Sequence, residues 1–151
     1  MRKTGSDEHM AKILVSGCLL GNECRYKGDG CRCDAVLKLA ESHTLIAVCP
    51  EQMGGLPTPR IPSERVGERV ISAAGDDVTA QFKKGAETAL FLAQLNHVDF
   101  AVFKANSPSC GKGTIYDGTF TGGKKEGCGM TTDLLLKNGI PVYTEDEEWP
   151  L

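Results

Sequence analysis

The residues of this 151-residue chain that offer the most chemistry are its seven cysteines. Three of them, Cys18, Cys49 and Cys110, follow short apolar runs of the kind that form buried strands, either directly or after a short loop. The carboxyl ends of parallel strands lie along one edge of a sheet, where ligands bind, so these three thiols are expected to meet in space. Gathered thiols could hold a soft metal ion or an iron–sulfur cluster.

Spacing alone leaves such a metal site evenly balanced against a simpler interpretation. Free cysteine behaves as a small hydrophobic residue and is often buried in a core. A core role suits any one of the three cysteines, but it is less favoured for three at the same kind of position. The sequence contains no paired C-x-x-C motif that would support a metal site. Both interpretations therefore stay open at this point.

Other catalytic motifs are missing from the sequence. The C-x5-R loop of small cysteine phosphatases is not formed after Cys18, because Cys24 stands where the arginine belongs and Arg25 comes one residue late. The phosphate loop G-x-x-x-x-G-K-[ST] and the dinucleotide motif G-x-G-x-x-G are also absent. His43 and His97 sit at the C-terminal ends of predicted helices, where the helix dipole favours a cation. We interpret them as caps rather than catalysts.

The composition is that of a single packed domain, with 40% hydrophobic residues. Seventeen basic and 20 acidic residues leave a net charge of −3, which disfavours large nucleic-acid ligands. No apolar stretch approaches the roughly 20 residues of a membrane span, and residues 1–10 lack the apolar centre of a signal peptide. We expect a cytoplasmic protein whose cysteines are thiols or ligands. Residues 1–11 are expected to be a disordered leader or an expression remnant, and residues 12–151 one domain.

The predicted elements alternate between strands and helices. Strands are expected at residues 13–15, 45–48, 98–103 and 141–143, and helices at residues 34–43, 77–96 and 131–138. Residues 17–33 and 54–62 are expected to be loops, and hairpins are predicted around residues 66–71 and, through the Asp117-Gly118 pair, over residues 115–120. The order predicts an α/β fold: one three-layer, Rossmann-like domain with a mostly parallel sheet.

Several sequence blocks resemble the thiouracil desulfidase family, whose members are widely described only as a domain of unknown function. The blocks are Ser16-Gly17-Cys18-Leu19-Leu20-Gly21, Cys24-Arg25-Tyr26-Lys27-Gly28, the run from Val48 to Arg60, the run from Lys104 to Gly111, and the run from Ile115 to Phe120. They occur in the family's order and cover about residues 12–145. The resemblance therefore extends over nearly the whole chain.

This resemblance implies a [4Fe–4S] cluster held by Cys18, Cys49 and Cys110, with the fourth iron open to substrate. Glu51 matches the family's catalytic acid/base, and Ser107 matches its catalytic serine. The implied activity is a non-redox desulfuration of a thiolated pyrimidine, 2-thiouracil giving uracil and hydrosulfide, in which the thione sulfur binds the open iron. The implied substrate is a small thiolated nucleobase or nucleoside, with tRNA-derived fragments as a further candidate.

The remaining cysteines match no ligand position. Cys24 belongs to the family pattern and is expected to shape its loop, while Cys31, Cys33 and Cys128 have no assigned role. If Cys24 or Cys128 reached the cluster, it would block the fourth iron. The alternative function is therefore a non-catalytic iron–sulfur or zinc-binding protein, such as a sulfur or iron carrier or a sensor.

Four further side chains are candidates for substrate contact. Arg60 and Lys104 could meet a substrate carbonyl or the cluster, although a surface role is the default for both. Tyr26 and Phe120 could stack on a pyrimidine, and packing in the core or in a hairpin is at least as well supported.

Overall fold

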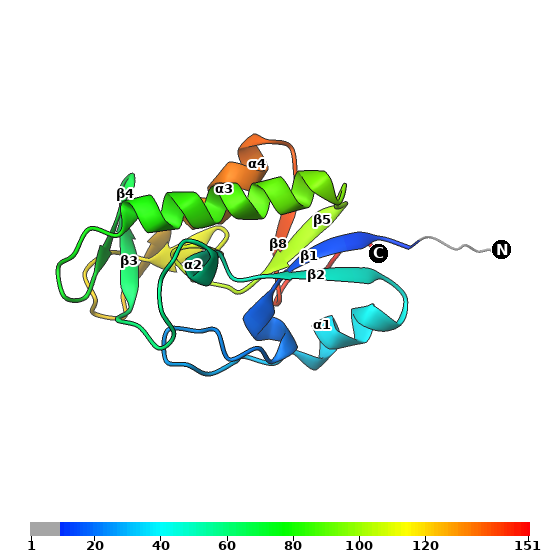
Figure 1. Ribbon diagram of the computed structural model, residues 1–151, viewed down its shortest axis with the longest axis horizontal. Coiled ribbons are helices and arrows are strands. Elements are labelled where there is room, and N and C mark those ends of the chain that lie inside the picture. The colour runs from blue at the N-terminus through cyan, green and yellow to red at the C-terminus, as the bar shows by residue number, and fades with distance from the viewer. Residues whose placement is uncertain (1–9) are drawn as a thin grey trace.

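The structure, a computed structural model, describes residues 10–151 (Figure 1). A leader is expected over residues 1–11, and residues 1–9 of that segment lie outside the described residues. The central sheet has four strands in the order β2-β1-β5-β8, and all three pairings are parallel. Its strands are β1 (Lys12–Ser16), β2 (Thr44–Val48), β5 (Phe100–Phe103) and β8 (Val142–Thr144). The predicted parallel α/β sheet is confirmed.

The two central strands are the most deeply buried part of the sheet. Every residue of β5 is buried, as is every residue of β1 except Lys12, because each strand has a neighbour on both sides and a helical layer on both faces. The same burial was predicted for β2, and this was wrong. Since β2 lies at the sheet edge, only Val48 is buried, at the end nearest the centre of the fold.

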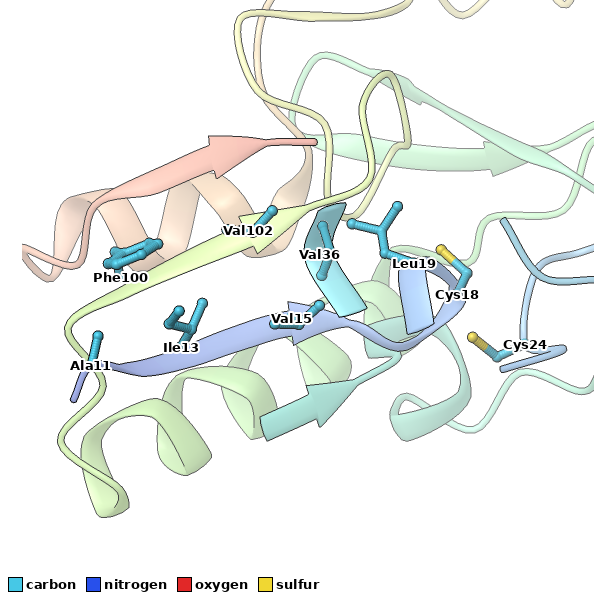
Figure 2. Close-up of a cluster of buried hydrophobic side chains, with 9 residues drawn as sticks. All are labelled: Ala11, Ile13, Val15, Cys18, Leu19, Cys24, Val36, Phe100 and Val102. Carbon is cyan, nitrogen blue, oxygen red and sulfur yellow. The ribbon is translucent and has the colours of Figure 1, made fainter. Parts of the chain in front are cut away.

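Helices cover both faces of the sheet, which confirms the three layers. Figure 1 shows α3 (Thr79–Leu95) and α4 (Met130–Lys137) on one side and α1 (Asp34–Lys38), which continues as the 3-10 turn η2 (Leu39–Glu41), on the other. Side chains of β1 alternate between these layers, as a strand requires. Ile13 and Val15 pack with Val36 of α1 (Figure 2), while Leu14 packs in the opposite cluster with residues of α3 and α4.

A short helix that the sequence did not indicate, α2 (Pro50–Met53), follows β2 directly. Proline is well suited to the first turn of a helix, where its missing N–H has no partner to lose. The helix packs closely on α3, because Gly85 of α3 leaves room for the Pro50 carbonyl. This contact sets the position of the residues around Cys49, which directly precedes α2.

Two hairpins extend from the sheet. The first, β3 (Ser63–Val66) with β4 (Arg69–Ser72), was predicted. The second pairs β6 (Thr114–Tyr116) with β7 (Lys124–Glu126), so the tight hairpin predicted over residues 115–120 is wrong. Asp117 and Gly118 lie instead in a wide connection, because Asp117 Oδ1 accepts the Thr119 N–H and the Gly118 N–H is donated to Glu64 on the first hairpin. Within residues 10–151, no helix is long and apolar enough to cross a membrane.

Candidate active site

A cavity of about 400 Å³ lies where β1, β2 and β5 reach their carboxyl ends. Its lining includes all five residues singled out from the sequence, namely Cys18, Cys49, Glu51, Ser107 and Cys110. They come from three loops that are far apart in the sequence. The convergence predicted from the parallel strand ends therefore occurs. His43 and His97 do not line this cavity.

Local backbone structure presents each thiol to the cavity in a different way. Cys18 lies in the 3-10 turn η1 (Gly17–Leu20), which follows β1 directly and ends at Gly21 with a φ of 96°. Cys49 is the extended N-cap residue that directly precedes α2. Cys110 follows the Ser107-Pro108 turn, and its N–H donates to Ser107 Oγ at 2.9 Å. Cys18 and Cys110 are almost fully buried, whereas Cys49 is half-buried.

A fourth thiol, Cys24, lies in the same cavity, which the sequence analysis did not predict. It is buried, and Figure 2 shows the Cys18 and Cys24 side chains next to each other. Its carbonyl accepts hydrogen bonds from Cys49 Sγ at 3.6 Å and from Arg60 at 3.0 Å. The only sign in the sequence that Cys24 could reach the site was its place in the family block Cys24-Arg25-Tyr26, shortly after Cys18.

The other three cysteines are not among the residues that line the cavity. Cys31 and Cys33 pack against the core cluster that contains Cys18, and the Cys128 carbonyl accepts a hydrogen bond from Arg65. All seven cysteines are free thiols. This agrees with the expectation that the chain does not rely on a disulfide framework.

Three of the cavity thiols, Cys24, Cys49 and Cys110, have raised pKa values. Burial raises the pKa of Cys110 to about 12. The Cys18 thiol raises the pKa of Cys24, and the Cys24 thiol together with burial raises the pKa of Cys49. Iron supplies the positive charge that buried thiolates lack, and thiolate is the ligand that iron–sulfur clusters use. The donor set therefore fits such a cluster.

A single metal ion suits this arrangement less well. Among residues 10–151, no three cysteine, histidine or carboxylate side chains converge on a point where one ion would sit. A structural zinc ion requires such a point, because its sulfur ligands lie only about 2.3 Å from the metal.

Glu51 is held by Arg60 in a buried ion pair. Arg60 Nε donates to Glu51 Oε1 at 2.9 Å. The Arg60 side chain is 6% exposed and the Glu51 side chain is 16% exposed. The surface role expected by default for Arg60 is therefore wrong. Lys104 lines the cavity too, and its ammonium group donates to Glu145 at 2.8 Å.

Glu51 and Ser107 are connected through a residue that the sequence analysis missed, Ser109. Ser109 Oγ donates to Glu51 Oε2 at 2.9 Å and lies 2.9 Å from Ser107 Oγ. Ser107 Oγ also accepts the N–H groups of Ser109 and Cys110, at 3.1 and 2.9 Å. The run Ser107-Pro108-Ser109-Cys110 was visible in the sequence, but nothing in it indicated that the second serine would face a carboxylate from another loop.

The chain is similar to known proteins over most of its length. The sequence model of a family described as 2-thiouracil desulfurase matches residues 13–147. An uncharacterized protein of Bacillus subtilis, YbbK, is 40% identical over 145 residues, which cover 89% of this chain and 96% of that protein. The solved structure of TudS, a [4Fe-4S]-dependent thiouracil desulfidase, has a TM-score of 0.83 and 47% sequence identity. The match covers 90% of this chain and 91% of that one.

Proposed function

Because this chain belongs to the 2-thiouracil desulfurase family, we propose that it catalyses the hydrolytic removal of sulfur from a thiolated pyrimidine. The type reaction converts 2-thiouracil and water into uracil and hydrosulfide, with no net electron transfer. The observation that carries this proposal is the convergence of three strand-end cysteines, a carboxylate and a serine on one cavity. Its volume of about 400 Å³ is in the range of small-molecule sites.

Cys18, Cys49 and Cys110 are the proposed ligands of a [4Fe–4S] cluster. They enter the cavity from three different loops, so together they could enclose a polynuclear group. When bound through three thiolates, such a cluster supplies an open iron that acts as a Lewis acid toward the soft thione sulfur. The chain's own side chains then have to bind the pyrimidine and handle protons.

Glu51 and Ser107 are the proposed proton-handling residues. Arg60 donates to Glu51 Oε1, so the oxygen available to take up a proton is Oε2, which accepts a hydrogen bond from Ser109. Two backbone N–H groups fix Ser107 Oγ at the cavity wall. In this arrangement Glu51 can take the proton of the water that adds to the ring and later return it to the product.

The proposed substrates are a thiolated base or nucleoside, and tRNA-derived fragments are a larger candidate. The cavity is lined by three aromatic side chains, Tyr26, Tyr116 and Phe120, whose rings could stack on a pyrimidine. The net charge of −3 favours a free base or nucleoside over a polynucleotide. We also propose the cytoplasm as the compartment, because its reducing conditions preserve free thiols.

The position of Cys24 favours one alternative. With four thiols in the cavity, every iron of a cluster could have a cysteine ligand, and the protein would then carry a cluster without an open iron. Mössbauer spectroscopy of 57Fe-loaded protein distinguishes the two functions. We expect one iron site that differs from three thiolate-bound sites; four equivalent thiolate-bound sites would favour the carrier.

The ligand and acid/base assignments are tested on anaerobically loaded protein. We expect about four iron and four sulfide per chain, and loss of the cluster's visible absorption in Cys18→Ala, Cys49→Ala and Cys110→Ala. Glu51→Gln should retain that absorption but lose about 100-fold or more of kcat, because the amide cannot take up the proton. Cys128→Ala, which removes a thiol outside the cavity, is the matched control for both measurements.

Two results would contradict the proposal. One is a fully loaded wild-type protein that releases no hydrosulfide from 2-thiouracil. The other is a Glu51→Gln variant with wild-type turnover, which would remove the acid/base role from Glu51 while leaving the ligand set in place.

A further inference from the structure

Ser109 lies between the two side chains proposed to handle protons, and it is only 2% exposed. We infer that Ser109 relays a proton from Ser107 to Glu51. The inference rests on the proposed function, since it concerns how the same site moves a proton. Ser109 would thus be a positioning residue that acts through its two neighbours.

The direction of the relay follows from the hydrogen-bonding capacity of Ser107. A serine hydroxyl has one proton to donate and two lone pairs to accept with. The N–H groups of Ser109 and Cys110 both donate to Ser107 Oγ, at 3.1 and 2.9 Å, and occupy the two lone pairs. Within the 2.9 Å contact between Ser107 Oγ and Ser109 Oγ, Ser107 must therefore be the donor.

Ser109 then has to donate onward to Glu51. Its Oγ accepts from Ser107 and lies 2.9 Å from Glu51 Oε2, where an ionised carboxylate can only accept. The Cys110 sulfur, 3.7 Å from the same Oγ, is a weaker acceptor. Arg60 Nε holds the other carboxylate oxygen, Oε1, at 2.9 Å. The hydrogen bonds therefore run from Ser107 through Ser109 to Glu51, and Arg60 is the last residue of this hydrogen-bonded series.

This order provides a balanced proton transfer. The Ser109 proton moves to Glu51 Oε2 while the Ser107 proton moves to Ser109, and the lone pair freed on Ser107 Oγ accepts a proton from a water or ring N–H in the cavity. Both serines finish with one proton each, and the net change is one proton moved from the cavity to Glu51. The two backbone N–H groups stabilise Ser107 Oγ while it carries negative charge.

The proton inventory of kcat, measured in mixtures of H2O and D2O with cluster-loaded protein, tests the relay. Wild type should give a bowed curve, because several protons move together. Ser109→Ala should lower kcat about 100-fold with KM little changed and a linear inventory. Its visible absorption and the electron paramagnetic resonance spectrum of its reduced cluster should match the wild type. Ser109→Thr, which keeps a hydroxyl, should recover most of kcat and the bowed inventory.

A double-mutant cycle adds a readout that a structural role would not produce. Because Ser107 and Ser109 act as one unit, Ser107→Ala combined with Ser109→Ala should lose no more kcat than Ser107→Ala alone. Ser72→Ala is the matched control: it removes a buried hydroxyl, the acceptor of the Asp76 N–H, away from the cavity. This variant should keep the wild-type kcat and inventory.

Two outcomes would overturn the relay and leave the proposed function intact. One is a linear inventory for an active wild type, a result that does not depend on whether any variant folds. The other is Ser109→Ala with wild-type kcat. Failure of the loaded wild type to release hydrosulfide would instead overturn the proposed function itself, so the two failures are distinguishable.

Discussion

Arg60 joins three separate segments beside the cavity. Its guanidinium group donates to Glu51 of α2, to Pro57 and Thr58 of the following turn, and to the carbonyl of Cys24 in the loop after β1. A planar group with five donors on three nitrogens can serve acceptors from separate segments, whereas the three donors of a lysine all lie on one nitrogen. Because the Arg60 side chain is only 6% exposed and the Glu51 side chain 16%, water cannot readily replace Arg60 at the carboxylate.

Arg60→Ala should therefore destabilise the protein by about 3 kcal/mol, since it leaves a buried carboxylate without its partner. Arg32→Ala is the matched control. Arg32 also pairs with a carboxylate, Asp34, at 2.8 Å, but the two side chains are 70% and 85% exposed. Its removal should cost less than about 1 kcal/mol. Urea denaturation of both variants checks the difference, and equal losses would contradict a structural role for Arg60 at the site.

At the scale of secondary structure, the contact between α2 and α3 places one cluster ligand and the acid/base residue. A side chain added at Gly85 of α3 would overlap the carbonyl of Pro50, and one added at Gly54 would overlap the carbonyl of Gln81. The two helices therefore touch through their backbones. Cys49 is the N-cap of α2 and Glu51 lies in its first turn, so a shift of α2 moves both residues.

Gly85→Ala should destabilise the protein by about 1–3 kcal/mol, because the added methyl group forces the two helices apart. A loss of stability would point to the backbone contact, since alanine is normally favoured over glycine inside a helix by about 1 kcal/mol. Glu87→Ala, which places alanine at an exposed position of the same helix, should change stability by less than about 0.5 kcal/mol. Urea denaturation measures both variants. A stabilised Gly85→Ala would show that the backbone contact is not required.

For the whole molecule, the cavity joins loops that follow three strands of one sheet. A group bound by thiolates from all three loops would link segments that are far apart in the chain, and it would bind only the folded state. Its binding free energy would then add to the free energy of unfolding. The cluster-free protein keeps the Cys49 and Cys110 thiols protonated, because burial contributes to raising both pKa values.

The stability of the cluster-free protein should therefore fall as the pH rises above about 8.5, where cysteines of the unfolded chain ionise. Burial raises the pKa of Cys110 to about 12 in the folded state. The folded protein thus binds more protons than the unfolded chain between these values, so the free energy of unfolding decreases with pH. Each such thiol contributes a slope of up to roughly 1.4 kcal/mol per pH unit.

Urea denaturation of cluster-free wild type and Cys110→Ala between pH 7 and 10 checks this dependence. The variant should lose less stability over this range, because one of the buried thiols is gone. A variant whose stability falls as steeply as that of the wild type would contradict the burial argument. The cluster-loaded protein should be more stable than the cluster-free protein at every pH.

The sequence by itself determined the sheet, the long helix and the meeting point of the three cysteines. Apolar runs such as 13–15 and 98–103 leave water most readily as buried strands, and a 3.6-residue period such as that of 77–96 buries one face as a helix. Once these strands are parallel, their carboxyl ends must share an edge. The convergence of Cys18, Cys49 and Cys110 could therefore be predicted from the sequence alone.

Only the tertiary structure decided how the rest of the cavity is built. The place of Cys24, the ion pair of Arg60 with Glu51 and the position of Ser109 are contacts between residues that are distant in the chain. The pairing of β6 with β7 was likewise decided by contacts that outweighed the local turn preference of Asp117-Gly118. Such contacts leave no periodic pattern, because they depend on how packed elements orient single side chains.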